Sequence, residues 1–139
     1  MLFSVLVGRY ARYSGSIGAR VEELEPGRSR VTLRDRAKVR NHLQSVHATA
    51  LVTLGELASG LAMMTAMPPE TRAIVTGLDI EYLKKARGLL TAHGNAPTPE
   101  GDERREYVVS ASIRDTSDDE VARMQVRWLV GPEKSKGFG

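Results

Sequence analysis

The sequence predicts an α+β domain in which an antiparallel sheet curls around one long, buried helix. Two observations support this prediction. Apolar residues recur at helical spacing through residues 46–67, and strand-like alternation lies on both sides of that segment. With 139 residues, of which 41% are hydrophobic and 27% charged, the chain is long enough for one core and too short for two. Strands segregated around a single helix favour an α+β architecture.

The strands are predicted from period-two alternation and from turn residues. The runs at 17–25 and 28–35 flank a Pro-Gly pair, which predicts a β-hairpin. A Pro-Pro pair follows residue 67 and is expected to end the helix. The remaining strands are expected at residues 72–84, 88–93, 103–115 and 121–130.

Three segments are expected along the chain. Residues 1–13 are predicted to form a short amphipathic helix packed on the domain, 14–131 the domain itself, and 132–139 a flexible polar tail. The apolar N-terminal stretch is too short to span a bilayer, and its arginines follow it instead of preceding it. We therefore expect a cytoplasmic protein with no membrane partner.

The composition argues against several classes of function. The chain has no cysteine, which excludes disulfides, thiolate metal sites and a cysteine nucleophile. Its three histidines form no ligand motif, so no metal site is expected. The net charge of +3 suits an anionic ligand. With two Phe, four Tyr and one Trp and no aromatic-plus-basic motif, a nucleic-acid partner is not expected.

Glu56 is the one acidic residue within the long apolar segment 46–67. A buried carboxylate without a partner is costly, so its presence requires a reason. Thr49, Thr53 and Gly60 stand at helical spacing from it and draw a mildly polar stripe that could line a cleft. Two interpretations are open at this point. Glu56 either has a structural role, in a buried network or at an exposed corner, or acts as a general acid or base whose pKa is raised by desolvation.

The residues around the start of this helix resemble a known family. Asn41 is followed six residues later by His47, then by the small residue Ala48, and Glu56 comes nine residues after the histidine. This pattern resembles the loop-to-helix signature of hotdog-fold thioesterases. The resemblance is greatest to the phenylacetyl-CoA thioesterase-like branch and, within it, to a group of single-domain hotdog proteins. It extends over roughly residues 15–130, and residues 74–88 resemble the strand that follows the helix in that family.

The resemblance implies a hotdog fold, in which a five- or six-stranded antiparallel sheet wraps the long helix. It also implies a homodimer, or a dimer of dimers, whose sheets join edge to edge and whose two active sites lie in the interface. Dimerisation of this kind would cover an exposed sheet edge. No metal or redox cofactor is implied, and coenzyme A enters only as part of an acyl-CoA substrate.

The resemblance also assigns roles to the four signature residues. Glu56 of one subunit would act as general base on water, or as nucleophile. Asn41 of the partner subunit would orient the water or the carboxylate, and His47 would shape the same loop. The backbone N–H of Ala48 would polarise the thioester carbonyl, because a helix N-terminus presents free N–H groups and a partial positive charge.

Further residues are candidates for substrate binding. The polar stripe on the helix could line the cleft, and some family members hold the water with a Ser or Thr on the next strand. Two basic clusters, at 36–40 and 84–87, could contact the phosphates of coenzyme A, or could be solvated positive edges. The candidates are Thr49, Thr53, Gly60 and Thr76 for the cleft, and Arg40, Lys84, Lys85 and Arg87 for the phosphates.

Hydrolysis of an acyl-CoA thioester is therefore the leading hypothesis for function. The alternative is a non-catalytic hotdog module that binds acyl-CoA or an acyl carrier, or serves only as a structural dimer. A dehydratase or hydratase on the same fold is less favoured, because the chain lacks the catalytic histidine pattern of that branch. Glu56 discriminates between the first two hypotheses: a position in a cleft favours hydrolysis, and a salt bridge inside the core favours binding alone.

Overall fold

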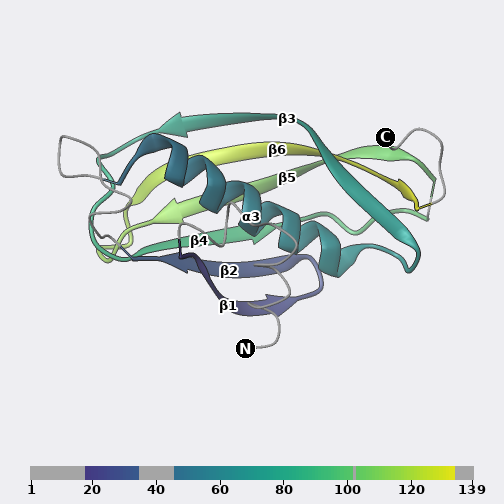
Figure 1. Cartoon of the computed structure of the whole chain (residues 1–139), viewed down its shortest axis with the longest axis horizontal. Helices are drawn as coiled ribbons and strands as arrows, with labels where there is room; N and C mark the ends of the chain where they lie inside the picture. Colours follow the sequence, from purple (N-terminus) through teal and green to yellow (C-terminus); the bar gives the residue numbers. More distant parts are fainter. Residues whose placement is uncertain (1–17, 35–45, 102, 134–139) are drawn as a thin grey trace.

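The computed structural model describes residues 18–34, 46–101 and 103–133. The predicted N-terminal helix, most of the predicted tail and the loop containing Asn41 lie outside these residues. Within them the chain forms one α-helix and six β-strands (Figure 1). The elements are β1 (Arg20–Glu25), β2 (Arg28–Leu33), α3 (Ala48–Ala66), β3 (Thr71–Tyr82), β4 (Leu90–Asn95), β5 (Arg105–Arg114) and β6 (Glu120–Pro132).

The strands form one antiparallel sheet in the order β1-β2-β4-β5-β6-β3. The helix α3 crosses one face of this sheet diagonally, and the strand that follows it, β3, lies at the far edge (Figure 1). This is the hotdog architecture, so the predicted fold class is confirmed, with six strands in the sheet. Each predicted strand is present, with ends shifted by up to three residues.

The helix α3 is the centre of the core. Most of its 19 residues are buried, and its leucines pack against the inner face of β2, β4, β5 and β6. Burying a leucine side chain contributes roughly 1.5–3 kcal/mol, so this helix is a major source of stability. It is also long and apolar enough to cross a membrane by length and composition, but its burial identifies it as a core helix.

Small residues allow the sheet to approach the helix very closely. Gly94 of β4 passes directly over the carbonyl group of Ala58, and the Ser29 hydroxyl of β2 donates a hydrogen bond to the same oxygen at 2.6 Å. At Gly55, the side chain of Met124 of β6 occupies the space that a Cβ would fill. The position of α3 against the sheet is therefore fixed by backbone-to-backbone packing in its middle.

The edge strand β3 is covered less completely than the rest of the sheet. It pairs with β6 along its length, and among the described residues no strand pairs with its other side. Its helix-facing residues Val75, Leu78 and Ile80 are only partly buried, and Tyr82 is exposed. A long strand with an open edge and apolar side chains is a surface that proteins usually cover.

We predict that Gly94→Ala lowers the free energy of unfolding by about 1–3 kcal/mol, because its Cβ would meet the main chain of α3. The matched control is Gly77→Ala, whose Cβ would meet only the flexible side chain of Arg127 and should cost less than about 1 kcal/mol. Urea unfolding followed by the fluorescence of Trp128 measures both values. Equal losses would contradict the close contact between β4 and α3.

Candidate functional site

Glu56 lies in the middle of α3, on the side of the helix that the sheet leaves open. Its neighbours Gly55 and Leu57 are buried, whereas Glu56 itself is exposed. Surrounding protein atoms still remove part of its hydration, and this desolvation raises the pKa of the Glu56 carboxyl above its ordinary value. Within the described part of the chain, the carboxylate forms no ion pair and accepts no hydrogen bond.

An apolar strip of side chains from α3 and the edge strand β3 begins one helical turn from Glu56. Val52, one helical turn before Glu56, packs with Leu78 and Ile80 of β3 over the buried side chains of β6. Val75 continues this strip. These four residues, Val52, Val75, Leu78 and Ile80, are all partly buried, so Glu56 stands beside a surface suited to an apolar ligand or partner.

The N-terminus of α3 is capped by His47. The imidazole Nδ1 accepts a hydrogen bond from the Thr49 N–H at 3.2 Å and lies 2.8 Å from the Thr49 hydroxyl. The next two amides, of Ala50 and Leu51, donate to the His47 carbonyl. In the described residues, the Ala48 N–H makes no hydrogen bond, and Ala48 is exposed. A single unused donor therefore stands at the positive end of the helix dipole.

Ala48 and Glu56 are too far apart on one helix to act on the same atom. They are eight residues apart, which corresponds to about 12 Å along an α-helix. A carbonyl oxygen bound at the Ala48 N–H thus cannot have its carbon next to Glu56 of the same chain. If both residues serve one reaction, they must come from two copies of the protein.

Two residues of the predicted polar stripe have other partners. The hydroxyl of Thr53 is buried and donates to the Thr49 carbonyl at 3.0 Å. Gly60 is buried beneath the indole ring of Trp128, and a Cβ there would lie 3.0 Å from that ring. The stripe is therefore interrupted one turn beyond Glu56, and the contribution of Gly60 is to admit the tryptophan.

Trp128 and Ser59 support the helical turn that carries Glu56. The indole Nε1 donates to the Ser59 hydroxyl at 3.1 Å, and that hydroxyl donates to the Glu56 carbonyl at 2.8 Å. Sequence reasoning did not select either residue. The sequence does contain a single tryptophan and small residues on the helix. Which of them meet depends on how β6 lies against α3, and local sequence does not show this.

Thr76 does not lie beside Glu56. It sits at a β-bulge in β3 and donates to the Glu106 carboxylate at 2.7 Å, on the face of the sheet away from the helix. The neighbouring residue Val75 is the one that faces α3. The bulge therefore turns the Thr76 hydroxyl outward and leaves the apolar side chain of Val75 on the helix side.

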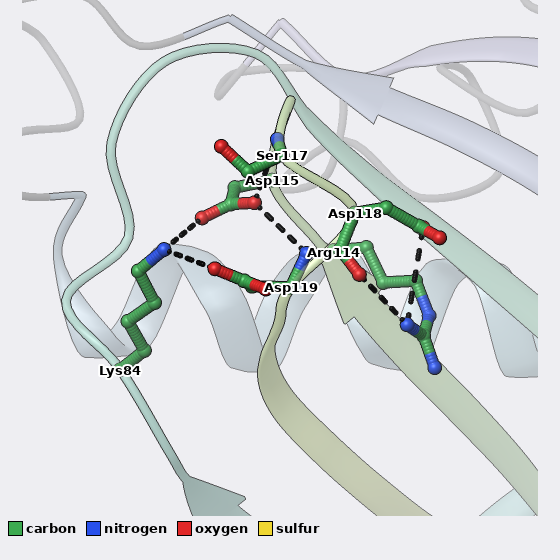
Figure 2. A network of polar contacts seen from close by, with 6 residues as sticks. All are labelled: Lys84, Arg114, Asp115, Ser117, Asp118 and Asp119. Carbon is green, nitrogen blue, oxygen red and sulfur yellow. Dashed lines mark hydrogen bonds and ion pairs between the residues drawn. The ribbon is translucent and has the colours of Figure 1, made fainter.

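The predicted phosphate-binding residues are not alike in their surroundings. Lys84 Nζ lies 2.7 Å from an oxygen of Asp115 and 2.7 Å from an oxygen of Asp119 (Figure 2). Lys85 and Arg87 are exposed on the same connection. Arg40 and Asn41 lie outside the described residues, so the structure does not place them.

The hollows described on the surface lie on the outer face of the sheet, not at Glu56. They are lined by polar side chains from β1, β2, β4, β5 and β6. Their charges are paired, across strands in Arg30 with Glu23 at 2.6 Å and within β6 in Arg123 with Glu120 at 2.8 Å. No three His, Asp or Glu side chains of the described ranges converge as metal ligands. We therefore place the candidate site on α3.

Comparisons with solved structures agree with the hotdog architecture. The genomics protein APC5556 is 32% identical with a TM-score of 0.82, covering 94% of this chain and 88% of its own. PA5026 from Pseudomonas aeruginosa, a protein of unknown function called a probable thioesterase, is 23% identical with a TM-score of 0.81 over 94% of both chains. A thioesterase family protein from Silicibacter pomeroyi is 18% identical with a TM-score of 0.81, covering 93% of this chain and 96% of its own.

The family of the chain follows from a match over most of its length. Residues 1–130 match the family described as Domain of unknown function (DUF4442), and the chain belongs to that family. No curated protein matches the chain. The similarity to proteins called thioesterases lies below 25% identity, so it establishes the shared hotdog fold, and the activity has to be argued from the site.

We predict that Glu56→Gln stabilises the folded protein at neutral pH. Because the pKa of Glu56 is raised in the folded state, folding favours its protonated form, and the wild type loses stability as the pH rises through that pKa. The melting temperatures of wild type and variant should coincide near about pH 3, below the ordinary glutamate pKa, and the variant should be higher at about pH 7.

The control for this experiment is Glu103→Gln, which changes an exposed glutamate far along the chain. It should show no such dependence on pH. A Glu56→Gln variant less stable than wild type at neutral pH would mean that a partner stabilises the charged carboxylate, and would contradict the raised pKa.

Proposed function

We propose that this protein hydrolyses acyl-CoA thioesters as a homodimer, with Glu56 as its catalytic carboxylate. The observation that carries the proposal is Glu56 itself. It is the one acidic residue of an otherwise apolar helix, it has a raised pKa, and no described residue pairs with it. A carboxylate kept near an apolar surface without a partner is poised to exchange a proton with a bound group.

The reaction needs a base, a water molecule and a donor for the oxyanion. Glu56 takes a proton from water as the water oxygen attacks the thioester carbonyl carbon. The carbonyl oxygen becomes an oxyanion, which accepts a hydrogen bond from the Ala48 N–H at the positive end of the helix dipole. The carbon–sulfur bond then breaks, and the thiolate takes the proton from Glu56, which releases a carboxylic acid and coenzyme A. Direct attack by Glu56 as nucleophile is the variant of this route.

Two chains are needed for one site. Since Ala48 and Glu56 are about 12 Å apart along α3, the oxyanion donor comes from one subunit and the carboxylate from the other. The open edge of β3, 12 residues long, suits an edge-to-edge dimer that brings the two helices together. Asn41, from the loop before the partner's helix, is proposed to orient the attacking water.

Substrate contacts are proposed for the two ends of the ligand. The acyl group would lie on the apolar strip formed by Val52, Val75, Leu78 and Ile80. The phosphates would be met by Lys85 and Arg87, together with Arg40. The reaction requires no metal or redox cofactor, and we propose a cytoplasmic enzyme that acts as a dimer or a dimer of dimers.

One observation favours a non-catalytic acyl-CoA-binding module as the second candidate. On β3, Val75 lies on the helix side of the sheet, while the hydroxyl of Thr76 is bound to Glu106 on the other face. An attacking water would thus lack one hydrogen-bond partner that related enzymes supply. Binding without turnover is the outcome that this arrangement would give if Asn41 cannot hold the water alone.

The proposal predicts that Glu56→Ala and Glu56→Gln reduce thiol release from acyl-CoA by about 10²–10⁴-fold, because a general base is lost. A panel of acyl groups, aromatic and aliphatic, identifies the substrate, and Glu103→Gln is the matched control that should keep wild-type turnover. For the wild type, the rate should rise with pH through a pKa above the ordinary glutamate value.

Two results would decide against this function. If folded wild-type protein binds acyl-CoA saturably but releases no thiol from any member of the panel, the binding module is the correct function. If Glu56→Gln retains wild-type turnover, the carboxylate is not the base.

A further inference from the structure

Lys84, Asp115 and Asp119 form a compact charged cluster beside the turn between β5 and β6, here called the Lys84 cluster (Figure 2). The side chain of Asp115 is only 8% exposed, and its second oxygen accepts the backbone N–H groups of Ser117 at 3.0 Å and Asp119 at 3.1 Å. The same carboxylate therefore holds its own turn and the lysine together. Each of its oxygens has a donor, so the position of the ammonium is well defined.

Residues 82–86, which include Lys84, form hydrogen bonds to the chain just before and just after His47, the N-cap of α3. The Tyr82 hydroxyl donates to the Ala48 carbonyl at 3.3 Å. The Ala86 carbonyl accepts the Val46 N–H at 2.7 Å, and both of these residues are buried. Lys84 lies midway between these two contacts. Any shift of residues 82–86 would therefore move the chain immediately before and after the helix N-terminus.

The same segment is also tied to the sheet. The backbone N–H groups of Leu83 and Lys84 both donate to the Val121 carbonyl, at 2.8 and 3.3 Å. Val121 is the second residue of β6 and follows the turn that holds Asp115 and Asp119. The Lys84 cluster thus links the β5–β6 turn to residues 82–86, and these residues in turn contact the first turn of α3.

The charge of the cluster is unfavourable for binding phosphate. One ammonium and two carboxylates leave it net negative, so an approaching phosphate of coenzyme A would be repelled. The hydrogen bonds that Lys84 donates to Asp115 and Asp119 raise the pKa of Lys84, and the one to Asp115 lowers the pKa of the Asp115 carboxyl. Lys84 and Asp115 are therefore charged at neutral pH, and two of the three ammonium hydrogens of Lys84 are engaged.

We propose that Lys84 is a positioning residue that fixes the N-terminus of α3, and with it the Ala48 N–H, through the contacts of residues 82–86. It does not bind the phosphates of the substrate. This inference rests on the proposed function, because it assigns a role in oxyanion stabilisation. Misplacing a donor by a fraction of its hydrogen-bond length weakens transition-state stabilisation while leaving the binding of the ground state almost unchanged.

The test compares two substrates with the same acyl group: the acyl-CoA and the N-acetylcysteamine thioester, which has no phosphate. For Lys84→Met, kcat should fall by about tenfold to a hundredfold on both substrates, with little change in the KM for acyl-CoA. Lys84→Arg should restore part of the loss. A raised KM confined to the acyl-CoA, with normal kinetics on the truncated thioester, would overturn the proposal and make Lys84 a phosphate ligand.

Two variants in the same turn serve as companions. Asp119→Asn removes one of the two carboxylates that hold Lys84 and keeps the buried Asp115 paired. It should give a smaller loss of kcat on both substrates, with little change in KM. This variant keeps the test usable if Lys84→Met does not fold. Asp118→Asn removes a carboxylate that pairs with Arg114 instead of Lys84, at a residue whose positive φ asparagine tolerates. It should leave kcat and KM unchanged.

A readout independent of activity separates this inference from the proposed function. Amide hydrogen exchange at Val46 and in the first turn of α3 should accelerate in Lys84→Met and Asp119→Asn, and not in Asp118→Asn. Unchanged exchange in both of the first two variants would overturn the positioning role, whatever the kinetics. Absence of turnover by the wild type on either thioester would instead reject the proposed function, with the exchange data still deciding what Lys84 holds.

Discussion

Burial of the apolar helix α3 against the inner face of the sheet is the constraint on which the rest of this structure depends. The helix has almost no polar face, so the sheet must surround it. Gly55 and Gly60 of the helix admit the side chains of Met124 and Trp128, and Gly94 lets β4 reach the helix main chain. The middle of the helix is consequently fixed against β4 and β6. Glu56 is exposed on a side of the helix that the sheet does not cover.

The same packing determines what the site can do. The helix is rigid, so its N-terminal donor at Ala48 and its carboxylate at Glu56 keep a separation of about 12 Å. In the proposed reaction, one chain therefore offers two half-sites instead of one complete site. Contacts distant from the reacting atoms then gain importance. Trp128 and Ser59 hold the turn of Glu56, and Lys84 with its aspartates is proposed to hold the helix N-terminus.

The helix, all six strands and the isolated Glu56 could be predicted, because each depends only on residues close together in the sequence: helical spacing, strand alternation, and one acid in an apolar run. His47 was predicted as a residue of the site, and the structure makes it the N-cap of α3. The partners of Lys84, the indole over Gly60 and the outward turn of Thr76 were not predictable. Each depends on cross-strand register or on a β-bulge, which link residues tens of positions apart.

The central claim, that each site combines Glu56 of one subunit with Ala48 of the other, is tested most directly by mixing two inactive variants. Glu56→Gln removes the carboxylate. Ala48→Pro removes the N–H at the first helical position, where proline is tolerated, and the extended backbone of His47 accepts it. The two variants are mixed and allowed to exchange subunits without unfolding. If the sites are shared, the mixture should recover about a quarter of wild-type turnover, because half of the dimers then hold one intact site. Two variants that stay inactive after forming mixed dimers would contradict the shared site.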